Sequence, residues 1–341
     1  MNFFEVIQVA LCGRCTLNCI MCGQPRIDEH MDTETLKNLN RDLLSFDSPP
    51  ILALAVRGEP LSHPFFPDAL EILSRKSVKG KFPYRELYID TNGQFLTVEN
   101  SKSLLNIAEE NNIFIRLTIS TDGGSKETYS RIRKNGDFDL LFSNIDNFLR
   151  LRKSSPSPAL NFQFIVMKEN IHEIDLFIDI IKNKLGKYSI IPKITGKYPE
   201  NTEDSISFVF HHPLIPSAEN MENSKILHHT VLNKLGIEHP PETVKIKKET
   251  CIWPFYMLVV RENGNIIPCC LDTKNEMIFG NINKKPLKKI IEGVEFTEFR
   301  MNHIKTHSLL PQKCINCEDQ LVVEKPGQKI ELFLKKVISP N

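Results

Sequence analysis

Short runs of β-branched and apolar residues alternate with segments of helical spacing through the first two thirds of this chain. Several of the runs are almost continuously apolar, which is typical of strands that are covered on both faces. The expected strands are Phe4–Leu11, Ile51–Val56, Glu86–Thr91, Ile113–Ser120, Leu160–Met167 and Lys187–Ile194. The expected helices are Thr33–Ser45, Pro64–Ser77, Val98–Asn111, Phe138–Arg152 and Ile171–Leu185. This alternation predicts right-handed βαβ units, and therefore an α/β fold with a parallel sheet or partial barrel.

The pattern changes after about Thr195. The stretch that follows is polar and contains several prolines, so we interpret residues 201–250 as an irregular connection. A different unit begins at Cys251, where two β-branched runs joined through Asn263-Gly264 predict a β-hairpin, followed by a helix around Leu287–Met301. The expected organisation is a barrel domain over residues 1–200, the connection, a small cysteine-rich domain over 251–320 and a C-terminal tail over 321–341.

The composition bears on partners and location. The 341 residues carry 43 basic and 42 acidic side chains, a formal net charge of +1, so we expect no basic face for nucleic acid. No apolar run approaches the roughly 20 residues that span a bilayer, and the N-terminus carries Glu5 but no basic signal segment. We therefore expect a cytoplasmic protein without a membrane partner. In that reducing compartment the nine cysteines point to metal binding or catalysis rather than to disulfides.

Three cysteines stand together directly after the first expected strand, in "CTLNCIMC". In parallel α/β folds the chemistry lies at the carboxyl ends of the strands, so Cys15, Cys19 and Cys22 stand where a cofactor is expected. A [4Fe–4S] cluster normally takes four thiolates, and three local ligands would leave one iron open. The alternative is a structural zinc ion that is also bound by Cys12.

The same run matches the C-x3-C-x2-C motif of the radical S-adenosylmethionine (radical SAM) superfamily. "VRGEPLSHP", at the end of the second expected strand, resembles the GGEP segment of that family, with Arg57 in place of the first glycine. "YIDTNGQFLT", "LTISTDGGSKETYSRIRKNGDFD" and "FIVMKENIHEI" resemble its third-, fourth- and fifth-strand segments. The resemblance runs from about residue 5 to residue 320.

The resemblance implies a partial (β/α)6 TIM-like barrel and a set of roles. Cys15, Cys19 and Cys22 would hold the [4Fe–4S] cluster, and SAM would chelate its open iron. An electron, from a donor such as flavodoxin or ferredoxin, would cleave SAM to a 5′-deoxyadenosyl radical that removes a hydrogen atom from the substrate. The candidate SAM contacts are Gly58, Glu59 and Pro60 for the amine, Ser120 and Asp122 for the ribose or the carboxylate, and Arg131 for the carboxylate. Alternatively, residues 120–123 form only a turn and a helix cap.

A second set of cysteines lies near the C-terminus. Adjacent thiols such as Cys269 and Cys270 rarely bind one metal, because alternate strand residues point to opposite faces. Four ligands therefore come naturally from Cys251, Cys269, Cys314 and Cys317. Their spacing resembles that of a SPASM or Twitch domain with one auxiliary [4Fe–4S] cluster, and the alternative is a zinc ribbon. Cys12 is then expected to be a small buried residue. Cys270 is either a packing residue or the donor that returns a hydrogen atom to a substrate radical.

An auxiliary cluster with four protein ligands has no open iron for substrate, so we expect it to accept an electron from a substrate radical. Net oxidation follows from that interpretation, and it fits a carbinol oxidised to a ketone and a modified peptide equally. Because the first expected strand begins within about five residues of the start, we expect no N-terminal peptide-recognition module, and this favours a small polar substrate such as a sugar or an aminocyclitol. The alternative is crosslinking or epimerisation of a ribosomally made peptide. A non-enzymatic iron–sulfur or zinc scaffold is a further alternative, which only Arg57 supports.

Overall fold

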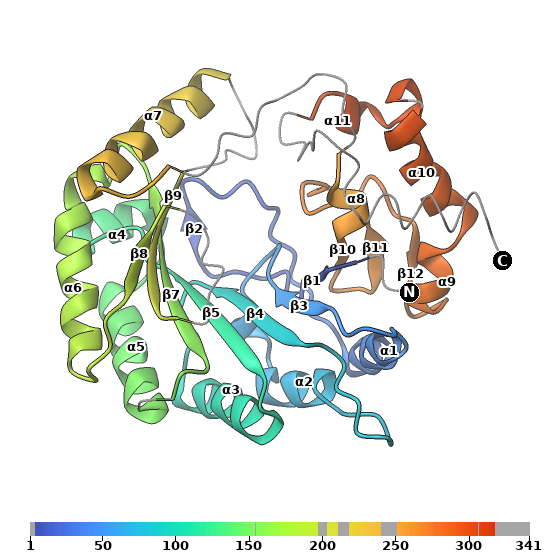
Figure 1. The fold of residues 1–341 in the computed structure, drawn as a ribbon, viewed down its shortest axis with the longest axis horizontal. Coiled ribbons are helices and arrows are strands. Elements are labelled where there is room, and N and C mark those ends of the chain that lie inside the picture. Colours follow the sequence, from blue (N-terminus) through green and yellow to red (C-terminus); the bar gives the residue numbers. More distant parts are fainter. Residues whose placement is uncertain are drawn as a thin grey trace.

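The apolar runs of the sequence lie side by side in one ten-stranded sheet (Figure 1). The structure is a computed structural model, and it describes residues 4–153, 155–196, 203–210, 218–239, 251–305 and 307–317. The strands are β1 (Val6–Val9), β3 (Ile51–Leu54), β4 (Glu86–Thr91), β5 (Phe114–Ser120), β7 (Ala159–Val166), β8 (Lys193–Thr195), β9 (Ser205–Phe210), β10 (Met257–Val260), β11 (Asn265–Ile267) and β12 (Gly280–Asn281). Their order is β12-β11-β10-β1-β3-β4-β5-β7-β9-β8, and pairing is parallel from β10 to β8. The predicted α/β fold with a parallel, partial-barrel sheet is confirmed.

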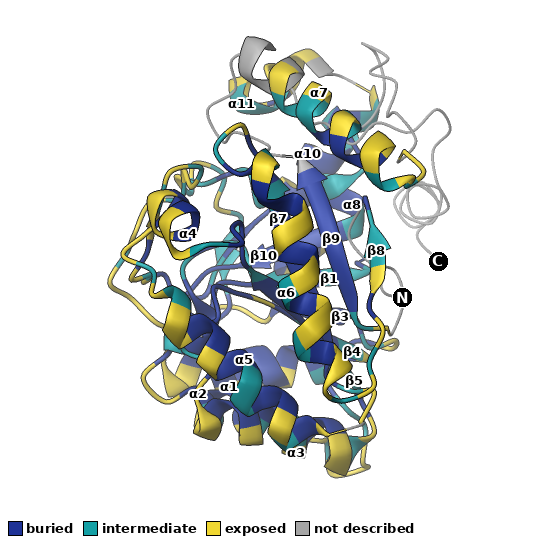
Figure 2. Cartoon of the chain, turned by 90° about the vertical axis from the view of Figure 1, so that its left-hand side faces the viewer, coloured by how far each residue is buried: buried dark blue, intermediate teal, exposed yellow. Residues whose placement is uncertain are grey.

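Helices cover the outer side of this curved sheet (Figure 1). They are α1 (Thr33–Leu44), α2 (Phe66–Leu73), α3 (Val98–Asn111), α4 (Lys126–Ile132), α5 (Phe138–Arg152) and α6 (Ile174–Gly186). Asp32, Thr97 and Asp137 cap α1, α3 and α5, because each side chain accepts a hydrogen bond from a backbone N–H of the first turn. Figure 2 shows the buried side of α6 turned toward the strands and its exposed side turned outward. No described helix has the length and apolarity needed to cross a membrane.

The two faces of the sheet differ in polarity. Leu52, Ile89 and Phe162 belong to the face that packs with the helices in the hydrophobic core. The alternate residues face the inside of the curve, since Asp90 and Ser120 of that set line a cavity there. This inner set is largely polar and includes Gln8, Glu86, Tyr88, Asp90, Arg116, Thr118, Ser120, Asn161, Gln163, Ser205 and Ser207. A closed barrel core is normally filled by branched apolar side chains, so this inner face is suited to a polar ligand instead.

The prediction of an irregular connection over residues 201–250 is wrong for two segments, which form a strand and a helix. Strand β9 pairs with β7 along its full length and fills the sixth position of the barrel. Helix α7 (Ala218–Leu235) follows and packs against β9. The sequence "SISFVF" does alternate polar and apolar residues, as a strand with one polar face does, but the polar and proline-containing residues around it favour an irregular connection. The expected strand Lys187–Ile194 is reduced to β8, which pairs with β9 at the edge of the sheet. The remainder of that connection lies outside the described residues.

The C-terminal unit continues the same sheet. Strand β10 pairs with β1 in parallel, with Met257 opposite Val6, so the sheet crosses the expected domain boundary. The predicted hairpin is confirmed as β10 and β11, and Gly264 in its turn has a φ of +83°. The expected helix around Leu287–Met301 is two helices, α9 (Leu287–Ile291) and α10 (Val294–Lys305). The tail over 321–341 lies outside the described residues.

Candidate functional site

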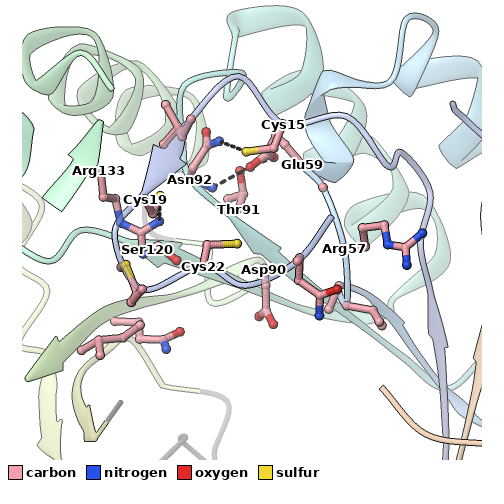
Figure 3. A pocket seen from close by; sticks show the side chains of 18 of the residues that line it. Cys15, Cys19, Cys22, Arg57, Glu59, Asp90, Thr91, Asn92, Ser120 and Arg133 are labelled. Atoms are coloured by element: carbon pink, nitrogen blue, oxygen red, sulfur yellow. Dashed lines mark hydrogen bonds between the residues drawn. The ribbon is translucent and has the colours of Figure 1, made fainter. Parts of the chain in front are cut away.

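A cavity of about 620 Å³ opens at the carboxyl ends of the central strands (Figure 3). It is lined by Gly13, Cys15, Leu17, Cys19, Met21, Cys22, Gln24, Pro25, Arg26, Ala55, Val56, Arg57, Gly58, Glu59, Asp90, Thr91, Asn92, Ser120, Arg133, Gln163, Ile165, Gly196 and Val209. The structure therefore brings the three clustered cysteines together with the ends of β3, β4, β5 and β7. This is the place that the rule for parallel α/β folds predicts.

The cysteine segment is held at two points. Its short strand β2 (Asn18–Cys19) pairs with β6 (Arg133–Lys134), which sets Cys19 opposite Arg133. The Arg133 guanidinium donates to the Cys19 sulfur at 3.6 Å, and the Asn92 amide donates to the Cys15 sulfur at 3.7 Å. Burial raises the pKa of Cys15 to about 11. Burial also raises the pKa of Cys19, and the positive charge of Arg133 partly offsets that rise. A bound metal centre is what converts such buried thiols to thiolates.

The donor set fits an iron–sulfur cluster better than a single metal ion. Among the described residues, no three His, Cys, Asp or Glu side chains are placed to hold one ion. The thiolates of a cubane cluster each bind a different iron, so its ligands surround a volume instead of converging on a point. Cys15, Cys19 and Cys22 all line one part of the cavity (Figure 3). Cys12, the fourth ligand of the zinc alternative, is buried at the strand end and accepts from the Ser62 hydroxyl at 3.5 Å.

The segment that resembles GGEP, around Gly58 and Glu59, packs directly against the start of the cysteine segment. Gly58 has a φ of +68°, and a Cβ there would overlap the carbonyl oxygen of Cys12 and lie 2.7 Å from the carbonyl carbon of Gly13. The Glu59 N–H donates to the Arg14 carbonyl at 2.8 Å. Gly58 and Glu59 both line the cavity, as predicted for SAM contacts. Pro60 is buried at the start of a 3-10 turn (Pro60–Ser62) and is not among the cavity-lining residues.

Glu59 uses its carboxylate to join neighbouring strand ends. It accepts hydrogen bonds from the Leu61 N–H at 3.1 Å, the Thr91 hydroxyl at 2.6 Å and the Asn92 N–H at 2.7 Å. Burial raises its pKa to about 7, and these hydrogen bonds oppose that rise. Because Asn92 in turn contacts Cys15, the carboxylate fixes one side of the cysteine site.

Arg57 faces away from the cysteines. The Arg57 N–H donates to the Ala55 carbonyl at 3.0 Å around Val56, whose φ is +82°, so β3 ends in a strained γ-turn. The Arg57 guanidinium lies 3.1 Å from the Glu262 carboxylate and also donates to the Thr273 carbonyl. Both charged side chains are buried. Arginine in place of glycine therefore connects the cavity wall to the C-terminal hairpin, while the backbone of the segment still reaches the cysteine loop.

Among the other sequence-predicted SAM contacts, Ser120 lines the cavity and two residues do not. Asp122 is fully buried, and its carboxylate accepts from Arg133 Nε at 2.7 Å and from the Ile165 N–H at 2.6 Å. Arg131 donates to the Glu169 carbonyl at 3.0 Å, outside the cavity lining. Helix α4 turns Arg131 outward, whereas β6 brings Arg133 to the cavity. The pairing of Arg133 with the cysteine segment has no local sequence signal.

Sequence reasoning also missed Asp90. It is the last inward-facing residue of β4, and its side chain extends into the open middle of the cavity (Figure 3). The side chain is accessible from the cavity yet surrounded by protein, and this desolvation raises its pKa to about 6, with the Thr118 hydroxyl and Arg116 opposing. Its position before "TNG" at a strand end was the available signal.

The four cysteines of the second set also meet. Cys251, Cys269, Cys314 and Cys317 line one small cavity. The rest of its lining is Trp253, Pro254, Pro268, Leu271, Asp272, Met277, Phe299, His303 and Lys313. Burial raises the pKa of Cys314 to about 12, and a hydrogen bond to Cys270 together with burial raises the pKa of Cys269. Cys270 lies beside Cys269 and is not among the described residues that line either cavity.

Family comparisons agree with both sites. The family model of the radical SAM superfamily matches residues 9–181, and the SPASM model, an iron–sulfur cluster-binding domain, matches residues 251–318. A curated relative, the S-adenosyl-L-methionine-dependent 2-deoxy-scyllo-inosamine dehydrogenase of Niallia circulans, is 31% identical over 88 residues. That match spans 26% of this chain and 35% of the relative's length.

Solved structures share the fold. BtrN in complex with AdoMet and 2-DOIA is 17% identical with a TM-score of 0.53, over 94% of this chain and 96% of that one. Native anSMEcpe with bound AdoMet is 16% identical with a TM-score of 0.59, over 98% and 96%. Streptococcus suis SuiB bound to its precursor peptide SuiA is 11% identical with a TM-score of 0.60, over 88% and 67%. With the superfamily model covering more than half of its length, this chain belongs to the radical SAM superfamily and carries a C-terminal SPASM domain, and its cofactors are SAM, a SAM-binding [4Fe–4S] cluster and an auxiliary iron–sulfur cluster.

Proposed function

We propose that this enzyme oxidises a small polar substrate, such as an aminocyclitol or a sugar, at a carbon that bears a hydroxyl group. The observation that carries the proposal is the polar part of the cavity wall that the inner face of the sheet supplies, which includes Asp90, Ser120 and Gln163. A substrate rich in hydroxyl groups can satisfy such a surface, whereas an apolar substrate would leave its hydrogen-bonding groups unpaired. The similarity to an aminocyclitol dehydrogenase supports the same substrate class.

The residues at the first site have separate tasks. Cys15, Cys19 and Cys22 would hold the SAM-binding cluster, and Ser120 with the Gly58–Glu59 backbone would contact SAM. When bound, the cluster and SAM supply a 5′-deoxyadenosyl radical that removes a hydrogen atom from the substrate. Glu59 and Arg133 position the cysteine segment.

The second site supports oxidation over a redox-neutral reaction. Cys251, Cys269, Cys314 and Cys317 would ligate the auxiliary cluster fully, which suits it to electron acceptance. An epimerase would need a hydrogen donor facing the substrate, and Cys270 is not among the described residues that line the cavity. We expect a small electron carrier such as flavodoxin or ferredoxin to supply the reducing electron. Arg57 no longer favours a non-enzymatic scaffold, because its side chain serves the contact with the C-terminal hairpin.

The cofactor content can be tested by anaerobic reconstitution and counting of iron and sulfide. The parent protein is expected to hold about eight irons, and a variant with Cys15, Cys19 and Cys22 all changed to Ala about four. A parent with about four irons that falls to none, together with retained zinc, would contradict the electron-acceptor role of the second site.

The substrate class is tested by supplying reduced, reconstituted enzyme with SAM and 2-deoxy-scyllo-inosamine. Formation of 5′-deoxyadenosine and of the corresponding ketone is the expected result. In a parallel assay, a precursor peptide encoded beside the gene would replace the aminocyclitol. Modification of the peptide alone would replace the proposed substrate class with the peptide alternative.

A further inference from the structure

Two carboxylates are among the described residues that line the cavity, and they differ in what they already contact. Glu59 is buried, and three hydrogen-bond donors of the chain occupy its oxygens. Asp90 faces the cavity, and its side chain is held from one neighbouring strand by the Thr118 hydroxyl. Among the described cavity-lining residues, Asp90 is therefore the carboxylate that a bound substrate can reach (Figure 3).

Oxidation of a carbinol to a ketone requires more than removal of a hydrogen atom. The carbon loses a hydrogen atom to the 5′-deoxyadenosyl radical, which leaves a carbon radical that still bears its hydroxyl group. Conversion of this radical to the ketone then releases one electron and one proton. An oxidised iron–sulfur cluster held by the second set of cysteines would take up the electron, and the proton needs an acceptor at the substrate hydroxyl. A general base must lie within hydrogen-bond reach of the proton that it takes.

The other charged groups among the described cavity-lining residues are unsuited to that task. Arg133 forms an ion pair with Asp122, and Arg57 forms an ion pair with Glu262, so both arginines are cations that already have a carboxylate partner. Arg26 is a cation as well, and it donates to the Leu17 carbonyl at 2.9 Å. The three cysteines are assigned to the cluster. A guanidinium is protonated throughout the physiological range and cannot accept the proton.

We propose that Asp90 accepts the hydroxyl proton of the substrate as the carbon radical is oxidised to the ketone. This role rests on the proposed function and makes Asp90 a catalytic residue. Its geometry is suited to the task, because Thr118 on β5 orients the carboxylate from the side while the other edge remains open to the cavity. A pKa of about 6 is also appropriate, since the carboxylate is mostly ionised at neutral pH and still basic enough to hold a proton transiently.

The test compares the parent with Asp90→Asn and Asp90→Glu, using 2-deoxy-scyllo-inosamine deuterated at its carbinol carbons. Asp90→Asn keeps the shape of the side chain and removes its basicity. We expect deuterium to enter 5′-deoxyadenosine within about threefold of the parent level, while the ketone formed per 5′-deoxyadenosine falls about 100-fold. Asp90→Glu should recover part of the ketone yield, because it restores a carboxylate. Asp179→Asn, which removes a carboxylate from the exposed side of α6 and outside the described cavity lining, serves as the control and should match the parent.

Binding and stability are measured alongside turnover. Calorimetric titration of 2-deoxy-scyllo-inosamine into each reconstituted protein should give dissociation constants within about threefold for the parent and Asp90→Asn, and melting temperatures should agree. A ketone yield per 5′-deoxyadenosine that is unchanged in Asp90→Asn would overturn the proposal. So would a loss of affinity that fully accounts for the lost product. If the parent itself neither labels 5′-deoxyadenosine nor forms the ketone, the proposed function fails first, and the role of Asp90 fails with it.

Discussion

At the scale of single residues, the two cavity carboxylates show how environment separates chemically similar groups. Both have pKa values raised by desolvation, yet the oxygens of Glu59 bind the protein and Asp90 keeps an open side. Glu59 is thus a residue that positions others, and Asp90 is the one available to substrate.

The raised pKa of Asp90 predicts a pH dependence of stability. An acid whose pKa is higher in the folded state contributes stability that is fully present below the unfolded value, here 3.8, and lost as pH rises through about 6. The unfolding free energy of the cluster-free parent should therefore fall relative to Asp90→Asn as pH rises through this window. Urea denaturation at several pH values measures it. A difference that stays constant over the window would show that the pKa of Asp90 is not raised.

Glu59→Ala should destabilise the fold around the cysteine site, because three hydrogen-bond donors lose their acceptor. The Leu61 N–H, the Thr91 hydroxyl and the Asn92 N–H would each lose their acceptor in a buried setting. An unsatisfied buried group costs about 1–3 kcal/mol. We expect at least that loss of unfolding free energy, with reduced iron at the first site. Glu71→Ala, on the exposed side of α2, should stay within about 0.5 kcal/mol of the parent, and equal losses in both variants would contradict this role of Glu59.

At the scale of elements, the end of β3 and the cysteine loop pass too close together for a side chain between them. Gly58 combines a left-handed backbone with contact against the Cys12–Gly13 peptide. The strained turn at Val56 immediately precedes it. Strain of this kind persists where the surrounding structure determines it, and it clusters at functional sites. Placement of the cluster ligands therefore depends on this crossing of two segments.

Gly58→Ala and Gly80→Ala separate backbone strain from steric overlap. Both glycines have positive φ, +68° and +78°, but a Cβ at Gly80 would meet nothing within 4 Å. Gly80→Ala should cost about 1–3 kcal/mol from backbone strain alone. Gly58→Ala should cost more and should also lower the iron bound by Cys15, Cys19 and Cys22, because the Cys12–Gly13 peptide must move. Thermal denaturation and iron analysis measure the two effects, and equal behaviour of the variants would exclude a role for the close approach.

At the scale of the whole molecule, the two cysteine sites belong to one continuous structure. Strand β10 joins the barrel sheet beside β1, and Arg57 reaches from the cavity wall to Glu262 and Thr273. Arg261 also donates to the Asp272 carbonyl at 2.7 Å. Two guanidinium groups therefore hold the segment that follows Cys269 and Cys270. The distance between the two cluster sites is fixed by this packing and not by a flexible linker.

A double-mutant cycle on Arg57 and Glu262 tests that connection. Removing one partner of a buried ion pair leaves an uncompensated charge and costs about 3–5 kcal/mol, whereas replacing both by apolar groups costs much less. Arg57→Met and Glu262→Leu should each destabilise strongly, and the double variant should recover much of the loss. The exposed pair Arg75–Glu71 should show a coupling of less than about 1 kcal/mol. Additive losses at Arg57 and Glu262 would mean that the two side chains act independently.

The strand and helix alternation, the parallel α/β class and the grouping of the cysteines could all be derived from the amino-acid sequence alone. These features are local: the periodicity of apolar residues selects each element, and capping residues such as Asp32 and Thr97 mark where helices begin. The motif around Cys15 and the segment around Gly58 identified the superfamily for the same reason, since each is contiguous in the chain.

Which side chains face the cavity was settled by tertiary contacts. Arg133 lies at the cavity, where Arg131 was expected, because the short antiparallel strands β2 and β6 set it opposite Cys19. Asp122 lies outside the cavity lining, because its carboxylate accepts hydrogen bonds from Arg133 and from the Ile165 N–H. Strand β9 is not predicted from the sequence because it is a short run inside a polar, proline-containing stretch, and its place in the sheet depends on parallel pairing with β7. Asp90 and the Arg57–Glu262 pair depend on contacts between distant segments. Such contacts carry no local sequence signal, because their energies arise only when burial brings the partners together.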